Sequence, residues 1–234
     1  MTPRAPIIHH LSPNSEPRRG GAVDMLVLHY TGMQSGADAL ARLTDEAAKV
    51  SSHYLVEEDG TVFSLVPENQ RAWHAGLSHW RGETDVNSRS IGVEIVNPGH
   101  EFGYRAFPVV QMDAVIRLCL GVLSRHSISP RNVVGHSDIA PTRKQDPGEL
   151  FPWDRLKSYG IGLWPFDGTE RADLPPEQVL EMLTEYGYDV TEPEAAVAAF
   201  QRHFRPERVD GIVDYETGGR LTRLMAAVEG RLSL

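Results

Sequence analysis

The chain has 234 residues, 41% hydrophobic and 24% charged, and this ordinary globular composition excludes a disordered or collagen-like protein. Lys and Arg number 23 against 32 Asp and Glu, a net charge of −9, which argues against a nucleic-acid-binding protein. A single cysteine excludes an internal disulfide and a cysteine-rich structural zinc site, so any metal must be held by the ten histidines and by carboxylates. No run approaches the ~18 apolar residues of a membrane span.

The first recognisable elements are a buried strand and an amphipathic helix. Met25–Leu28 is a continuous apolar run that predicts a buried strand, and it leads directly into His29. Open α/β sheets tend to place chemistry at such strand ends. Ser35 is a suitable N-cap for the next helix. The apolar face of that helix would carry Leu40, Leu43, Ala47 and Val50.

A hairpin, a long loop and a third strand follow. Ser51–Val66 contains two β-rich runs that flank Asp59-Gly60, which predicts a hairpin with a tight turn. Residues 67–89 have no period and are rich in Trp, His, Gly, Asn and Arg, so we expect a long and functional loop region. Ser90–Asn97 predicts a strand that presents Glu94 on the face opposite its isoleucines.

The next segment combines a long helix, a short strand and a charged loop. Val109–His126 has apolar residues at helical spacing. Cys119 lies on that apolar stripe, so we expect a buried small residue rather than a nucleophile. Asn132–His136 predicts a fourth strand, and residues 141–153 form a loop dense in charge and proline.

The order of these elements predicts an α/β protein with a second, smaller part. Residues 1–160 are expected to form a domain with a mixed central β-sheet flanked by helices. Residues 161–173 are punctuated by Gly, Pro and Trp and predict a linker. Residues 174–234 are expected to form a small three-helix domain. Its helices would span Pro176–Tyr186, Glu192–Phe204 and Thr217–Val228.

Gly135–Leu156 is dense in ionisable groups. Charge-rich loops are more often solvated surface than functional sites. However, His136 follows an apolar strand as His29 does, and strand ends in one sheet can converge. Two histidines and one carboxylate form a standard catalytic zinc set. The residues alone leave open whether a metal binds here and whether its carboxylate is Asp138 or Asp146.

Five segments, in this order, carry a resemblance to a known family. The chain resembles the zinc-dependent N-acetylmuramoyl-L-alanine amidases of the AmpD/AmiD type, which are related in fold to T7 lysozyme and the peptidoglycan-recognition proteins. The segments are LHYTG (Leu28–Gly32), SSHYLVEEDGTV (Ser51–Val62), AWHAG (Ala72–Gly76), NSRSIGVEIVN (Asn87–Asn97) and GHSDIAPTRKQDPGELFPW (Gly135–Trp153).

The resemblance implies the roles of five residues. One Zn²⁺ per chain would be bound by His29, His136 and Asp146. Glu94 matches the family's general base or water-positioning acid, and Lys144 matches a lysine that stabilises negative charge in the transition state. Such a site would activate water to cleave the amide between the lactyl group of N-acetylmuramic acid, or its 1,6-anhydro form, and L-alanine.

The remaining candidates lie outside this set of five residues. Asp138 would then cap its loop or orient His136. His53 is expected to be structural or to support a ligand. Trp73 and His74 could line a substrate groove, and packing is an equal alternative for His74. We assign the other histidines to surface or loops, and these are His9, His10, His79, His100, His126 and His203.

Residues 174–234 resemble the small peptidoglycan-binding module of AmiD-like enzymes, and the alternative is a helical appendage that only packs on the catalytic domain. The segments that carry this resemblance are GYDV, AVAAFQRHFRP and VDGIVDYET. The expected protein is therefore an enzyme of peptidoglycan turnover or recycling, with muropeptides as partners. The alternatives are an inactive peptidoglycan-binding receptor and a zinc peptidase that cuts within the stem peptide. Because no apolar leader or N-terminal lipidation cysteine is visible, we expect a cytoplasmic location, or a periplasmic one if a native signal is missing.

Overall fold

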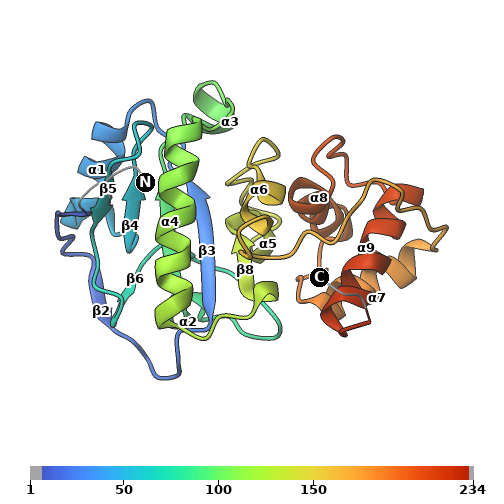
Figure 1. The fold of residues 1–234 in the computed structure, drawn as a ribbon. Coiled ribbons are helices and arrows are strands. Elements are labelled where there is room, and N and C mark those ends of the chain that lie inside the picture. Colours follow the sequence, from blue (N-terminus) through green and yellow to red (C-terminus); the bar gives the residue numbers. More distant parts are fainter. Residues whose placement is uncertain (1–6, 232–234) are drawn as a thin grey trace.

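The computed structural model describes residues 7–231, and its centre is a six-stranded mixed sheet in the order β1-β5-β4-β7-β3-β8 (Figure 1). A separate two-stranded sheet pairs β2 with β6. The strands are β1 (Ile7–His9), β2 (Ser15–Pro17), β3 (Met25–Tyr30), β4 (Tyr54–Val56), β5 (Val62–Ser64), β6 (Gln70–Ala72), β7 (Ser90–Ile95) and β8 (Val133–Gly135).

Helices flank this sheet and form the C-terminal part. Six α-helices lie in the first part of the chain: α1 (Gly36–Thr44), α2 (Val86–Arg89), α3 (Gly99–Phe102), α4 (Val109–Arg125), α5 (His136–Ile139) and α6 (Trp153–Lys157). Two 3₁₀ turns, Glu46–Ala48 and Pro130–Asn132, accompany them. The C-terminal module consists of α7 (Pro176–Tyr186), α8 (Pro193–Phe204) and α9 (Tyr215–Val228). No helix among residues 7–231 is both long and apolar enough to cross a bilayer.

The central strands are parallel, so their carboxyl ends meet at one edge of the sheet. β3 pairs in parallel with β7 on one side and with β8 on the other. The register places His29 beside Glu94, and Leu28 beside Gly135. His136 follows Gly135 directly, so both histidines and Glu94 reach the same level of the sheet. The expectation that two strand ends converge is confirmed.

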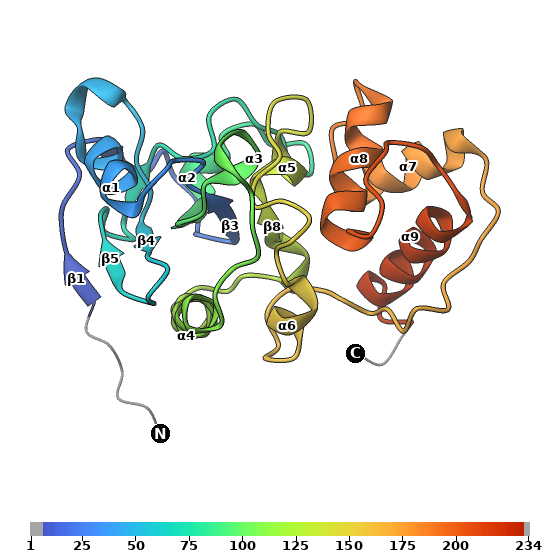
Figure 2. The same cartoon turned by 90° about the horizontal axis from the view of Figure 1, so that it is seen from above.

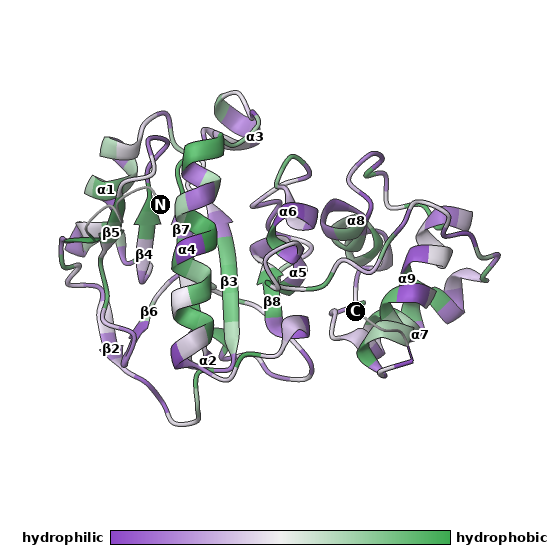
Figure 3. Cartoon of the chain, viewed as in Figure 1, coloured by the Kyte–Doolittle hydropathy of each residue, from purple (hydrophilic) through white to green (hydrophobic). Residues whose placement is uncertain are grey.

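The two faces of β3 pack against different partners. Leu26 and Leu28 face a core that includes residues of α4, among them the buried Cys119. Met25 and Val27 face the opposite core, and His29 shares their face because side chains alternate along a strand. The apolar stripe of β3 is visible in Figure 3. The functional side chains therefore lie on the face that α4 leaves free.

The C-terminal module shares a hydrophobic core with the rest of the chain. One cluster contains Val27, Trp80 and Val134 together with Leu183 and Phe200 of the module. Both cartoon views place α7, α8 and α9 beyond the β8 edge of the sheet (Figures 1 and 2). Residues 161–173 contain no helix or strand, but Leu163 is buried in this same cluster.

Most predicted elements are present, with differences at the first helix, the long loop and the fourth strand, which spans Val133–Gly135 rather than Asn132–His136 because His136 begins α5. The helix after Ser35 ends at Thr44, and Ser35 caps it as expected by accepting a hydrogen bond from the N–H of Asp38. Ala47 and Val50 lie beyond that helix because Asp45 caps a separate 3₁₀ turn. The expected loop of residues 67–89 contains β6 and α2, so the prediction of a structureless segment was wrong there.

Candidate metal centre and active site

Three donor atoms converge at the carboxyl edge of the sheet. His29 comes from the end of β3, His136 begins α5, and Asp146 lies in the loop that follows. The Nδ1 atoms of the two histidines are 3.0 Å apart, and the Asp146 Oδ2 atom lies 3.0 Å from His29 Nδ1 and 3.1 Å from His136 Nδ1. All three side chains are buried, and together they form a group that could hold a metal ion.

Hydrogen bonds around His29 determine which of its nitrogens carries the proton. The Ser90 hydroxyl donates to the carbonyl of Val86 at 2.7 Å, so at its 3.1 Å contact with His74 Nε2 it must accept. His74 Nδ1 is then the lone-pair nitrogen, and it accepts from His29 Nε2 at 3.0 Å. Burial and the neighbouring His136 lower the pKa of His29 to about 4. The neutral ring therefore directs the Nδ1 lone pair at the other donors.

His136 is oriented in the same way by a backbone carbonyl. Its Nε2 lies 3.0 Å from the carbonyl oxygen of Ala75, which can only accept, so Nε2 donates. In a neutral ring, Nδ1 then offers a lone pair toward Asp146. Although burial raises the pKa of Asp146, His136 and His29 hold it well below its usual range. Two ring nitrogens and one carboxylate oxygen thus face one another, a donor set that fits a bound cation.

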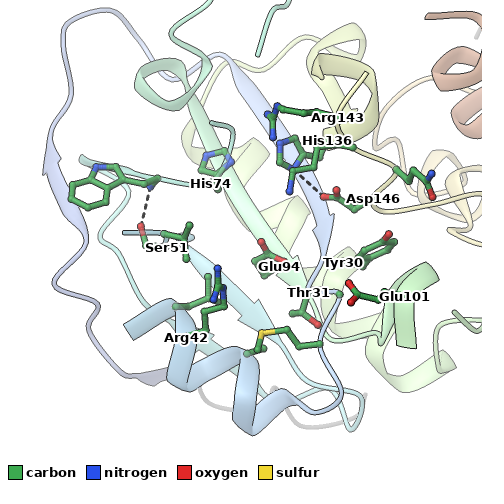
Figure 4. Close-up of a pocket in the computed structure, with 18 of the residues that line it drawn as sticks. Tyr30, Thr31, Arg42, Ser51, His74, Glu94, Glu101, His136, Arg143 and Asp146 are labelled. Atoms are coloured by element: carbon green, nitrogen blue, oxygen red, sulfur yellow. Dashed lines mark hydrogen bonds and ion pairs between the residues drawn. The ribbon is translucent and has the colours of Figure 1, made fainter. Parts of the chain in front are cut away.

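A cavity of about 460 Å³ opens beside these donors. Glu94 lines it together with Lys144, His74 and His136. Figure 4 shows the Glu94 carboxylate between Arg42 on one wall and the His136 and Asp146 pair on the other. Further side chains that line the cavity are Tyr30, Thr31, Trp73, Glu101 and Arg143.

Glu94 is held in an unusual electrostatic state. Its Oε2 atom is buried and has no hydrogen-bond partner among the described residues. Burial and the nearby Asp146 carboxylate raise the pKa of Glu94 well above its usual range, while Lys144 acts in the opposite direction. A carboxyl group with a raised pKa on the wall of a cavity is suited to proton transfer.

The candidate groove residues differ from one another in exposure. Trp73 is half-buried and lines the cavity. His74 is buried and contacts His29. It therefore both lines the cavity and holds one of the three candidate metal donors in place. Gly92 makes room for it, because a Cβ atom there would lie 2.4 Å from the His74 ring. The support of His29 by His74 escaped the sequence reasoning, since 45 residues separate the two histidines.

Two other expectations are settled by the geometry around α5. Asp138 is buried and is not one of the three converging donors; it caps α5 by accepting from the N–H of Gly135 at 2.7 Å. The assignment of His203 to the surface was wrong. This histidine is buried between the rings of Trp153 and Phe204. Helical spacing after Phe200 places it on the buried stripe of α8, which is the signal that could have located it.

Comparisons with known proteins agree with this geometry. Residues 19–149 match the N-acetylmuramoyl-L-alanine amidase family, and residues 177–221 match a putative peptidoglycan binding domain. N-acetylmuramoyl-L-alanine amidase AmiD of Escherichia coli strain K12 is 42% identical over 222 residues, which cover 83% of this chain and 79% of AmiD.

Two solved structures are similar over nearly the whole chain. The complex of E. coli AmiD with anhydro-N-acetylmuramic acid-L-Ala-D-gamma-Glu-L-Lys has a TM-score of 0.80 at 37% identity and covers 93% of each chain. AMPDH3 from Pseudomonas aeruginosa in complex with anhydromuramic pentapeptide has a TM-score of 0.81 at 36% identity and covers 89% of this chain and 93% of its own. With the converging donors and the matched family, the chain belongs to the N-acetylmuramoyl-L-alanine amidases, enzymes that hydrolyse an amide bond.

Proposed function

We propose that this protein uses Zn²⁺ held by His29, His136 and Asp146 to cleave the amide between the lactyl group of N-acetylmuramic acid and L-alanine. The observation that carries the proposal is the meeting of three electron-pair donors, two of which, His136 and Asp146, line a cavity that also contains Glu94 and Lys144. Two histidines and one carboxylate leave a fourth position of a tetrahedral zinc site open for water or substrate.

Zinc, when bound, lowers the pKa of a coordinated water to about 7 and polarises a carbonyl group. The protein supplies the proton transfers. The Glu94 carboxylate accepts a proton from the attacking water and then delivers it to the nitrogen of the departing L-alanine. The raised pKa of Glu94 supports this role, because it makes the carboxylate a stronger proton acceptor than an ordinary glutamate. No covalent intermediate with the protein is needed.

Lys144 supplies a positive charge at the same cavity. Attack on the amide carbonyl develops negative charge on its oxygen, and a fixed cation in a partly buried site stabilises that charge. The Lys144 backbone N–H donates to the carbonyl of Ala140 at 3.0 Å, which anchors the residue two positions before Asp146. The backbone of Lys144 is therefore fixed close to the donor set, and its side chain lines the same cavity.

The proposed substrates are muropeptides, including their 1,6-anhydro forms. Support comes from the two similar solved structures, whose ligands are an anhydromuramyl tripeptide and an anhydromuramic pentapeptide. Trp73 and His74 are the proposed groove residues. For the C-terminal module we propose binding to cell-wall polymer, supported by the match of residues 177–221 to a putative peptidoglycan binding domain. The cytoplasmic location stays a prediction, and fractionation of cells tests it.

One experiment separates the candidate activities. The purified chain is incubated with a defined anhydromuramyl peptide, and the products are identified by mass spectrometry. Free peptide with an L-alanine amino terminus is expected. Cleavage between amino acids would indicate a peptidase, and intact substrate in the presence of zinc would indicate a receptor. A chelator should abolish the cleavage and added zinc should restore it, because in this mechanism the attacking water is activated by the bound zinc.

A further inference from the structure

We propose that the C-terminal module is part of the metal centre, because its residues Tyr188 and His203 hold Asp138, and Asp138 fixes the start of the helix that begins with His136. Asp138, Tyr188 and His203 are positioning residues in this scheme. The inference rests on the proposed function, since it concerns the affinity of the His29, His136 and Asp146 site for zinc.

Asp138 is a buried carboxylate whose two oxygens are both occupied. Its Oδ1 atom accepts from the Tyr188 hydroxyl at 2.7 Å. Its Oδ2 atom accepts from the backbone N–H of Gly135 and contacts His203 Nδ1, each at 2.7 Å. All three side chains are buried. Two of the three partners of this carboxylate therefore come from the module, 50 and 65 residues away in the sequence.

The module presents these two donors from rigid surroundings. The His203 ring is stacked between Trp153 and Phe204, with centroid distances of 3.7 Å and 3.8 Å. The Tyr188 ring meets Trp80 edge to face at 5.3 Å. The preceding residue, Gly187, accepts a backbone hydrogen bond from Arg81 at 3.0 Å. A Cβ atom on Gly187 would lie 2.7 Å from the Arg81 side chain, so the two parts of the chain meet at backbone contact.

The cap formed by Asp138 is coupled directly to the donors. α5 has only four residues, His136–Ile139, so its first residue cannot move independently of its cap. The N–H of Ser137, the second residue, donates to the backbone carbonyl of Asp146 at 2.9 Å. A shift of α5 therefore displaces His136 and Asp146 together. Loss of a module donor would leave the buried carboxylate under-satisfied, and Asp138 would shift to find another partner.

The effect on zinc binding should be moderate. Removing a hydrogen-bond partner of a metal ligand typically weakens metal binding about 10–100-fold. Tyr188 and His203 act through Asp138 and the α5 backbone, so we expect a loss near the lower end, about tenfold. The module in this view does more than recruit polymer, because it completes the support of one side of the zinc site.

The test measures zinc affinity in the full-length chain. Metal-free protein competes with a chromogenic chelator for Zn²⁺, and thermal unfolding of each metal-free protein is recorded in parallel. Tyr188→Phe removes one hydroxyl and keeps the ring. His203→Phe keeps a stacking ring and removes the donor, whereas His203→Asn keeps a donor near the position of Nδ1 and removes the ring. Gln201→Leu is the control, because Gln201 is buried in the same helix and bonds only within the module.

Tyr188→Phe and His203→Phe should each bind zinc about tenfold more weakly than wild type. His203→Asn should bind it more tightly than His203→Phe, since the hydrogen bond and not the ring carries the effect. Gln201→Leu should unfold at a lower temperature with unchanged zinc affinity. Equal zinc affinity of wild type and Tyr188→Phe would overturn the inference, even if His203→Phe failed to fold. Wild type that binds no zinc would overturn the proposed function itself, a result that the same titration distinguishes.

Discussion

Glu94 and His29 are neighbours across two parallel strands, and only one of them is a candidate metal donor. Glu94→Gln keeps the shape of the side chain and removes the proton acceptor, so kcat on an anhydromuramyl peptide should fall about 10²–10⁴-fold with little change in KM. Zinc content, measured by plasma mass spectrometry, should stay near one per chain. Glu101→Gln is the matched control, since Glu101 lines the same cavity but is exposed. A fully active Glu94→Gln variant would show that Glu94 is not the general base.

His74 is expected to set the tautomer of His29. His74→Leu removes the acceptor for His29 Nε2, and without it the ring can rotate or present the wrong nitrogen. We expect zinc affinity to fall about 10–100-fold, measured by chelator competition. His79→Leu is the control, because His79 is half-buried in the same loop and contacts no candidate donor. Unchanged zinc affinity in His74→Leu would show that the chain of hydrogen bonds from Ser90 is dispensable.

At the scale of residues, part of this site could be predicted from the sequence. His29 and His136 can be found from apolar strands that end in a histidine. The choice between Asp138 and Asp146 cannot be made from spacing, because it depends on which way a four-residue helix turns its side chains. Asp138 faces the module and Asp146 faces the histidines. The family resemblance, and not periodicity, favoured Asp146.

At the scale of elements, Glu68 connects a loop to a strand and a long helix. Its carboxylate contacts Arg125 and His126 at the end of α4 and accepts from the Tyr54 hydroxyl of β4. Burial alone would raise the pKa of Glu68, but these hydrogen bonds lower it from 4.5 to about 2. The folded-state pKa is thus depressed, so the stabilisation is present above pH 4.5 and is lost as the pH falls toward 2.

Glu68→Gln should therefore lower the free energy of unfolding at pH 7 by about 1–3 kcal/mol. The difference from wild type should shrink below pH 4.5 and vanish as the pH falls below 2. Urea unfolding at a series of pH values measures this. Glu58→Gln, in the exposed pair with Arg105, should change stability by less than about 1 kcal/mol at any pH. A Glu68→Gln deficit that did not depend on pH would refute the electrostatic explanation.

Elements with a strong period, or with a turn signal beside them, were predictable, and several other short elements were not. α4 and the three module helices carry apolar stripes over ten or more residues and lie where the spacing places them. β1, β2 and β6 have three residues each, too few to display an alternating pattern. Their pairing with β5 and with each other is decided by tertiary contacts, which a local pattern does not contain.

At the scale of the whole molecule, the shared core predicts cooperative unfolding. Val27, Trp80 and Val134 pack in one cluster with Leu183 and Phe200 of the module. Calorimetry of the full chain should show a single transition, because neither part can keep its core when the other unfolds. Trp80→Ala should destabilise the whole molecule by about 3–5 kcal/mol and move that transition as one. Two transitions with separate midpoints would contradict the shared core.

The backbone contact at Gly187 has a consequence for recombination between amidases. A chimera joined within residues 161–173 would bring a foreign module whose turn does not fit Arg81 and Trp80. Its partner surface would be left with apolar side chains in water. A functional crossover must instead transfer Trp80, Arg81 and the β8 edge together with the module. The segment that recombination can exchange in this protein is thus the module together with its interface. The boundary of that segment lies inside the catalytic part of the sequence and not in the linker of residues 161–173.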